Sequence, residues 1–218
     1  MRLLLANPNT SGATTAAMLA VAREAAPDGM AIEGVTAQTG SALIIDDSAL
    51  ALAAEATVAL LQPSTVQDHA GVIVAAFGDP GLDALRRSLG VPVTGIAEAA
   101  MAEAAAQGRF VVVTTTPGLV DAIGRTAARY GHAGLFGGVR LTTGDPRILM
   151  QDPALLVAAL AAACAAAVHD GAAAIVIGGG PLATAARALR GHLPVPLVEP
   201  IPAAVRLAAW RGYGVLSR

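Results

Sequence analysis

Two stretches of the chain follow one plan: GVIVAAFGDPGLDALRRSLGVPVTGIAEAA at residues 71–100 and AAAIVIGGGPLATAARALRGHLPVPLVEPIPAA at residues 172–204. In each, an apolar strand meets a Gly/Pro turn, a helix carrying arginines follows, and a V-P-V or V-P-L strand closes the unit. Nearly continuous apolar strands that alternate with helices are typical of a parallel sheet covered on both faces. The repeat therefore predicts an α/β fold with two similar lobes.

A second, weaker repeat supports this interpretation. MRLLLANPNTSG at residues 1–12 and GRFVVVTTTPGL at residues 108–119 each read as a strand, a polar threonine-containing loop and the start of a helix. We expect residues 1–97 with 198–218 to form the first lobe and residues 98–197 the second. Each lobe is predicted to be a mainly parallel sheet flanked by helices. Ligands of such sheets bind beyond the carboxyl ends of the strands, which predicts a site in the cleft between the lobes.

The apolar pattern also predicts the individual elements. The expected strands are residues 2–6, 31–36, 71–76, 91–94, 109–114, 173–177 and 196–198. The expected helices include residues 12–25, 48–61, 81–89, 96–106, 117–130 and 153–169.

Composition excludes several classes of function. The net charge of −2 gives no reason to expect nucleic acid or an anionic membrane surface as a partner. All 14 basic residues are arginine, and the absence of lysine excludes Schiff-base catalysis, pyridoxal-phosphate attachment and a P-loop. The single cysteine, Cys164, excludes an intrachain disulfide, and the four histidines lack metal-ligand spacing. We therefore expect neither a cofactor nor a metal.

The chain carries no recognisable export signal, and its longest helical apolar run, residues 154–168, is shorter than the roughly 20 residues of a membrane span. The sequence therefore predicts a cytoplasmic protein without a membrane partner. We expect a homo-oligomer that takes a small-molecule substrate.

In each predicted lobe, a polar loop follows the first strand. Asn9, Thr10 and Ser11 lie in NPNTSG, and Thr114, Thr115 and Thr116 lie in TTTPG. Such residues are the ordinary N-caps of helices, which is one interpretation of both loops. The alternative is that the two loops face each other and hold both ends of a small polar ligand, such as a carboxylate or ureide.

Three further features are candidates for chemistry. Asp79, in FGDPG, is either the N-cap of the following helix or a general base whose pKa is raised by burial. Glu199 follows one of the paired V-P strands and could approach the cleft. Gly178, Gly179 and Gly180 form either an oxyanion cradle or a tight turn, and they do not match a dinucleotide fingerprint.

With these motifs, the chain resembles the aspartate/glutamate/hydantoin racemase superfamily, nearest its hydantoin and allantoin racemase branch. NPNTS, FGDPGL, VTTTP and IVIGGGPLA carry the resemblance along nearly the whole chain. The resemblance implies two pseudo-symmetric α/β lobes, no cofactor, and a substrate site between the lobes that includes Phe77 and Gly78. It also implies two catalytic cysteines, but the corresponding positions here are Ala76 and Gly179.

The function expected from the sequence is therefore an isomerase or racemase with a small hydantoin-, ureide- or amino-acid-like substrate and a mechanism without two thiols. Asp79, Glu199 or a water molecule held by Thr115 would supply the acid and base. The alternatives are a decarboxylase, a lyase or a C–N hydrolase that uses the same pocket, and a binding protein without turnover.

Overall fold

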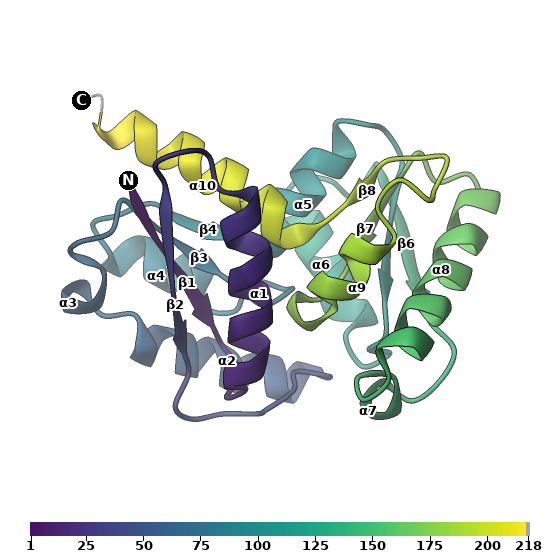
Figure 1. Cartoon of the computed structure of the whole chain (residues 1–218), viewed down its shortest axis with the longest axis horizontal. Helices are drawn as coiled ribbons and strands as arrows, with labels where there is room; N and C mark the ends of the chain where they lie inside the picture. Colours follow the sequence, from purple (N-terminus) through teal and green to yellow (C-terminus); the bar gives the residue numbers. More distant parts are fainter. Residues whose placement is uncertain (217–218) are drawn as a thin grey trace.

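The computed structural model describes residues 1–216 and contains two four-stranded sheets that lie side by side (Figure 1). All neighbouring strands within each sheet are parallel. In the first sheet the order is β2 (Ala31–Thr36), β1 (Arg2–Asn7), β3 (Gly71–Val74), β4 (Val93–Gly95). In the second sheet the strand order is β6 (Phe136–Leu141), β5 (Phe110–Thr114), β7 (Ala174–Ile177), β8 (Leu197–Val198). The predicted α/β class with two mainly parallel sheets is confirmed.

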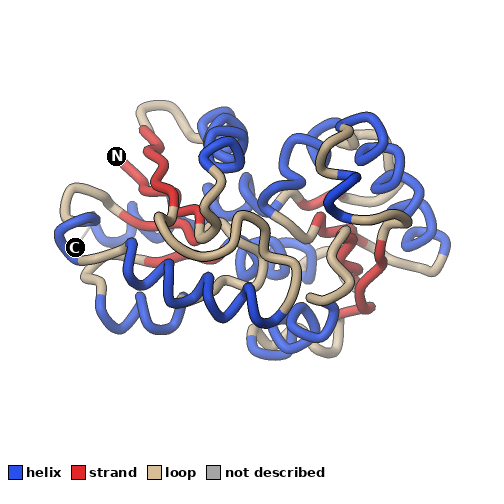
Figure 2. The backbone as a smooth tube through the Cα atoms, turned by 90° about the horizontal axis from the view of Figure 1, so that it is seen from below, coloured by secondary structure: helices blue, strands red, loops and turns tan. Residues whose placement is uncertain are grey.

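Helices cover both faces of the strands, as the tube view of Figure 2 shows. They are α1 (Gly12–Ala25), α2 (Asp47–Leu60), α3 (Pro63–Val66), α4 (Leu82–Ser88), α5 (Ile96–Ala105), α6 (Val120–Arg129), α7 (Pro146–Leu149), α8 (Pro153–His169), α9 (Ala183–Ala188) and α10 (Pro200–Leu216). A short 3-10 turn, Gly180–Leu182, precedes α9. No helix among residues 1–216 is long and apolar enough to cross a membrane.

The sequence located most elements, and the differences have physical reasons. Strand β2 and helices α1 and α8 have the predicted bounds. Helix α6 begins at Val120 rather than at residue 117, after a turn in which the Leu119 N–H donates to the Thr116 carbonyl. Strand β6 was not predicted, because its sequence FGGVRL holds two glycines and its residues are half-buried or exposed.

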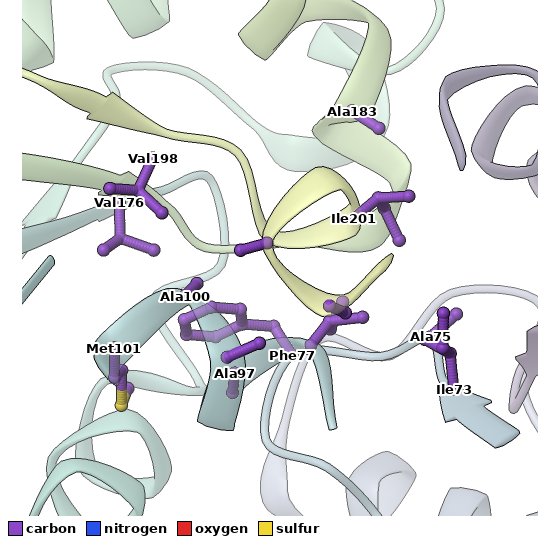
Figure 3. Close-up of a cluster of buried hydrophobic side chains, with 14 of the residues drawn as sticks. Ile73, Ala75, Phe77, Ala97, Ala100, Met101, Val176, Ala183, Val198 and Ile201 are labelled. Carbon is purple, nitrogen blue, oxygen red and sulfur yellow. The ribbon is translucent and has the colours of Figure 1, made fainter. Parts of the chain in front are cut away.

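One hydrophobic core continues from one sheet to the other. It contains Ile73 of β3 and Val176 of β7 together with the buried faces of α5 and α10. Figure 3 shows the ring of Phe77 beside Ala97 and Ala100 of α5 in this cluster. The loop that follows β3 is therefore anchored in the core by an aromatic side chain.

Candidate functional site

A cavity of about 50 Å³ lies beyond the carboxyl ends of strands from both sheets. Asn9 follows β1, residues 75–77 follow β3, residues 114–116 end β5, and residues 178–180 follow β7. The remaining lining residues are Leu43, Ile44, Leu119, Met150, Pro181 and Leu182. The edge of an open parallel sheet where the strands end is the usual place for a ligand, which makes this cavity the candidate site.

The Asn7–Asn9 pair shapes the first polar wall. The Asn9 Oδ1 accepts hydrogen bonds from Asn7 Nδ2 at 2.8 Å and from the Ser11 N–H at 2.9 Å. Both asparagines are buried, and Asn7 Nδ2 also contacts the Thr15 hydroxyl of α1 at 3.0 Å. Since its oxygen is engaged by two donors, Asn9 has its amide N–H groups to offer to a ligand.

Three buried threonines form a second polar part of the cavity wall. The Thr114 hydroxyl donates to the Gly178 carbonyl at 2.8 Å and lies 3.0 Å from the Thr116 hydroxyl. Thr115 and Thr116 line the cavity and are only 5% and 8% exposed. A network of this kind fixes the positions of hydroxyl groups before a ligand arrives.

The three glycines of the GGG loop differ in the space that their surroundings leave for a side chain. A Cβ at Gly178 would lie 2.5 Å from Val112, and one at Gly180 would lie 2.6 Å from Met18 Sδ and 2.9 Å from the Ala75 carbonyl. These two glycines are required by close packing. Gly179 has an extended backbone with φ of 170°, and a Cβ there would meet only the Leu182 side chain, at 3.2 Å.

A strap made of residues 38–46 contributes the apolar roof, Leu43 and Ile44. One end is held by a hydrogen bond from the Thr10 N–H to the Ser41 carbonyl at 3.2 Å, and the other by a bridge between Asp46 and Gly118. An exposed ion pair of 2.9 Å between Asp47 and Arg125 lies next to that bridge. These contacts hold the strap to the loop after β1 and to the turn before α6.

None of the residues that line this cavity, within the chain described, has an ionisable side chain. Its polar groups are one amide, three hydroxyls and backbone atoms. Ala76 and Gly179, which the family resemblance places at the two cysteine positions, both line it. The geometry can therefore bind and polarise a ligand, but an acid or base in contact with it must be water, a hydroxyl or a group brought in by rearrangement.

Asp79 lies behind the wall and holds the start of α5. Its carboxylate accepts hydrogen bonds from the N–H groups of Ala97 at 2.9 Å and Glu98 at 2.8 Å, and from the Tyr130 hydroxyl at 2.6 Å. Burial raises the pKa of Asp79 to about 6, although these three bonds favour the ionised form. The interpretation of Asp79 as the N-cap of the following helix was wrong, because the N-cap of α4 is Gly81. A role of Asp79 as a base stays a prediction.

Glu199 lies in a second cavity, where its Oε1 pairs with Arg190 at 2.6 Å. Its role as an acid or base also stays a prediction. Thr10, Ser11 and Gly78 lie next to lining residues without lining the first cavity themselves, and Ser11 instead caps α1 through Thr14 N at 3.2 Å.

The structure thus brings together most of the candidate site residues that the sequence singled out. The candidates that line the cavity are Asn9, Phe77, Thr114, Thr115, Thr116, Gly178, Gly179 and Gly180. Sequence reasoning missed the apolar wall. The Leu43-Ile44 pair within a polar loop was a usable signal for it, whereas Met150 reaches the cavity only through the tertiary fold.

Comparisons with known proteins agree with this architecture. Residues 3–208 match the sequence model of the Asp/Glu/Hydantoin racemase family. The hydantoin racemase of Paenarthrobacter aurescens is 29% identical over 211 residues, which are 95% of this chain and 89% of that protein. The structure of an allantoin racemase from Klebsiella pneumoniae superposes with a TM-score of 0.92 at 32% identity, over 100% of this chain and 89% of the other. The allantoin racemase of Pseudomonas fluorescens superposes with a TM-score of 0.87 at 31% identity, over 96% of this chain and 90% of the other. This chain belongs to the Asp/Glu/hydantoin racemase family.

Proposed function

We propose that the chain is a cofactor-independent isomerase that acts at the α-carbon of a small hydantoin-, ureide- or amino-acid-like substrate. The observation that carries the proposal is that two polar strand-end loops, one from each sheet, line one largely apolar cavity. Asn9 and the three threonines can hold the polar groups of the substrate, and the apolar roof can cover its side chain. The names of the relatives, hydantoin racemase and allantoin racemase, support a cyclic ureide as the first substrate to test.

The proton transfer proceeds without a pair of thiols, since Ala76 and Gly179 occupy the positions where the family resemblance places them. The α-proton of a hydantoin is comparatively acidic, because the adjacent carbonyl takes up the negative charge. Hydrogen-bond donors aimed at that oxygen lower the barrier further. A water molecule positioned by Thr115 then removes the proton and returns it, with Asp79 and Glu199 as the alternative groups.

The cavity has room for only a few water molecules, so a substrate enters by displacing part of its wall. The strap of residues 38–46 lies outside the helices and strands, and a shift of its Leu43 and Ile44 would widen the cavity.

The test is proton exchange at the α-carbon. The protein is incubated in heavy water with 5-substituted hydantoins, allantoin and acidic amino acids, and ¹H NMR follows the α-signal while polarimetry follows the enantiomers. We expect loss of the signal together with loss of optical rotation for at least one cyclic ureide, and a rate at least about tenfold lower for Thr115→Val, as is usual for removing a group that assists proton transfer. No deuterium uptake from any of these compounds contradicts the proposal.

The absence of an ionisable lining side chain, within the chain described, favours a second candidate. A decarboxylase, a lyase or a C–N hydrolase needs an oxyanion cradle and one positioned water, whereas racemisation needs proton transfer on both faces of the carbon. NMR product analysis with malonates and linear ureides distinguishes the two, because conversion without α-exchange supports this candidate. Thermal stabilisation by a ligand that is never converted supports a binding protein instead.

A further inference from the structure

A second cavity, of about 350 Å³, shares no lining residue with the first. Its walls come from the end of α1, from α5, from α9 and the residues just after it, and from β8, α10 and the residue Glu199 between them. In Figure 1, α1 stands beside α9 and the start of α10. The volume falls within the roughly 300–1,000 Å³ of small-molecule pockets.

The charged residues around this cavity balance one another. Three arginines and three glutamates line it as the ion pairs Arg187–Glu24, Arg190–Glu199 and Arg206–Glu103. A single ion of either sign therefore gains little net attraction. A ligand that carries both charges can exchange with the pairs and satisfy both signs at once.

Two buried polar atoms of residues that line this cavity have no hydrogen-bond partner among the described residues: Glu199 Oε2 and Arg187 Nε. Glu199 is only 6% exposed, and its other oxygen is held by Arg190 at 2.8 Å from Nε. A buried charged group with an unmet hydrogen bond is costly, so a donor for Glu199 and an acceptor for Arg187 would each stabilise the site.

We propose that this cavity binds the zwitterionic head group of a small α-amino acid. The ammonium group donates to Glu199 Oε2 after a small shift of the side chain, and the carboxylate accepts from Arg187. Ala25, Leu197 and Pro202 supply an apolar patch for a small aliphatic side chain. Because the two cavities share no lining residue, this binding is separate from a proton transfer through the water held by Thr115, and it replaces the alternative role of Glu199 as an acid or base.

The test is isothermal titration of the whole protein with glycine, L-alanine, L-leucine and L-phenylalanine, with propionate and propylamine as ligands that carry one charge only. We expect saturable binding of at least one amino acid and binding at least about tenfold weaker for both single-charge compounds, since each lacks one charged hydrogen bond. Glu199→Gln and Arg187→Met should each weaken the amino acid at least about tenfold for the same reason.

Two controls locate the site. Arg125→Met removes an exposed ion pair outside this cavity and should leave the affinity unchanged, and Thr115→Val alters only the first cavity and should do the same. If Glu199→Gln fails to fold, the affinities of Arg187→Met and of the single-charge ligands still test the proposal. The proposal is overturned if no amino acid binds, if propionate or propylamine binds as tightly, if both cavity variants retain full affinity, or if Thr115→Val abolishes binding.

Discussion

Ala76 and Gly179 line the candidate cavity from loops that follow β3 and β7, one strand in each sheet. Neither side chain can carry a proton. The backbone at Gly179 nevertheless accepts a side chain, because it is extended and the nearest obstacle to a Cβ is the movable Leu182 side chain. The two positions therefore border one cavity, and neither carries an acid or base.

This geometry predicts a gain of function. We expect Ala76→Cys combined with Gly179→Cys to racemise a hydantoin at least about tenfold faster than the wild type, since positioned acid–base groups contribute about 10²–10⁴-fold. Each single substitution should give much less, because one thiol serves one face of the carbon. Polarimetry and α-deuterium exchange measure the change. The matched control is the double serine variant, and equal activity of the serine and cysteine variants would contradict the prediction.

The raised pKa of the buried Asp79 carboxyl predicts that the stability of the protein depends on pH. Burial raises its pKa from 3.8 to about 6, so the folded state binds more protons than the unfolded state between these values. The contribution of Asp79 to the free energy of unfolding is therefore largest below pH 4 and falls as the pH rises to 6. Urea unfolding should show that Asp79→Asn lacks this decrease.

The same substitution should also lower stability at acidic pH, where the wild-type carboxyl is still partly or fully protonated. An amide nitrogen cannot accept from the Glu98 N–H, whereas either protonation state of the acid can, so we expect Asp79→Asn to cost about 1–3 kcal/mol at pH 5. The cost should be smaller at pH 7, where the ionised wild type is itself less stable. A loss of activity much larger than the loss of folded protein would instead indicate a base.

At the scale of elements, the start of α5 is built around this carboxylate. Gly95 precedes α5, and a Cβ there would lie 2.1 Å from Asp79 Cγ. Glycine is therefore required because a side chain 16 residues earlier in the chain occupies the space of its Cβ.

This contact predicts strong coupling between the two positions. We expect Gly95→Ala to destabilise the protein by about 1–3 kcal/mol, the usual cost of overpacking. In the Asp79→Gly background the added cost should fall by at least about 0.5 kcal/mol, because the obstructing carboxylate is gone. Chemical unfolding of the four proteins of the cycle measures the coupling. Gly12→Ala, which meets no atom within 4 Å, is the control for the substitution itself. Additive costs would show that the contact is relieved in another way.

The elements also show what the sequence could and could not predict. Apolar runs predicted β1, β3, β5 and β7, because each is buried on both faces. Strand β6 lies at an edge with half-exposed residues, and therefore lacks that signal. The polar residues of the site could be predicted because they follow strands directly. The partner of Asp79 could not, since the sequence does not indicate that the first turn of α5 lies over the loop after β3.

At the scale of the whole molecule, the C-terminal helix α10 returns to the first sheet and packs against α5, β3 and β4. An ion cluster fastens it there. Arg211 of α10 donates to both carboxylate oxygens of Glu98, at 2.9 and 2.8 Å, and to the Thr94 hydroxyl at 3.0 Å. Arg86 of α4 contacts the same carboxylate at 2.7 Å.

The cluster predicts how the molecule unfolds in acid. Partial burial opposes the ionisation of Glu98, but Arg211 and Arg86 outweigh it and lower its pKa from 4.5 to about 2. A lowered pKa contributes stability that is present above pH 4.5 and is lost as the pH falls toward 2. We expect Arg211→Met to cost about 1–3 kcal/mol at pH 7 by breaking charged hydrogen bonds. The difference from the wild type should shrink between pH 4.5 and 2, as followed by circular dichroism during urea unfolding. Arg125→Met, which breaks an exposed pair, should cost no more than about 1 kcal/mol. An equal cost for both variants would mean that the cluster does not fasten α10 to the first sheet.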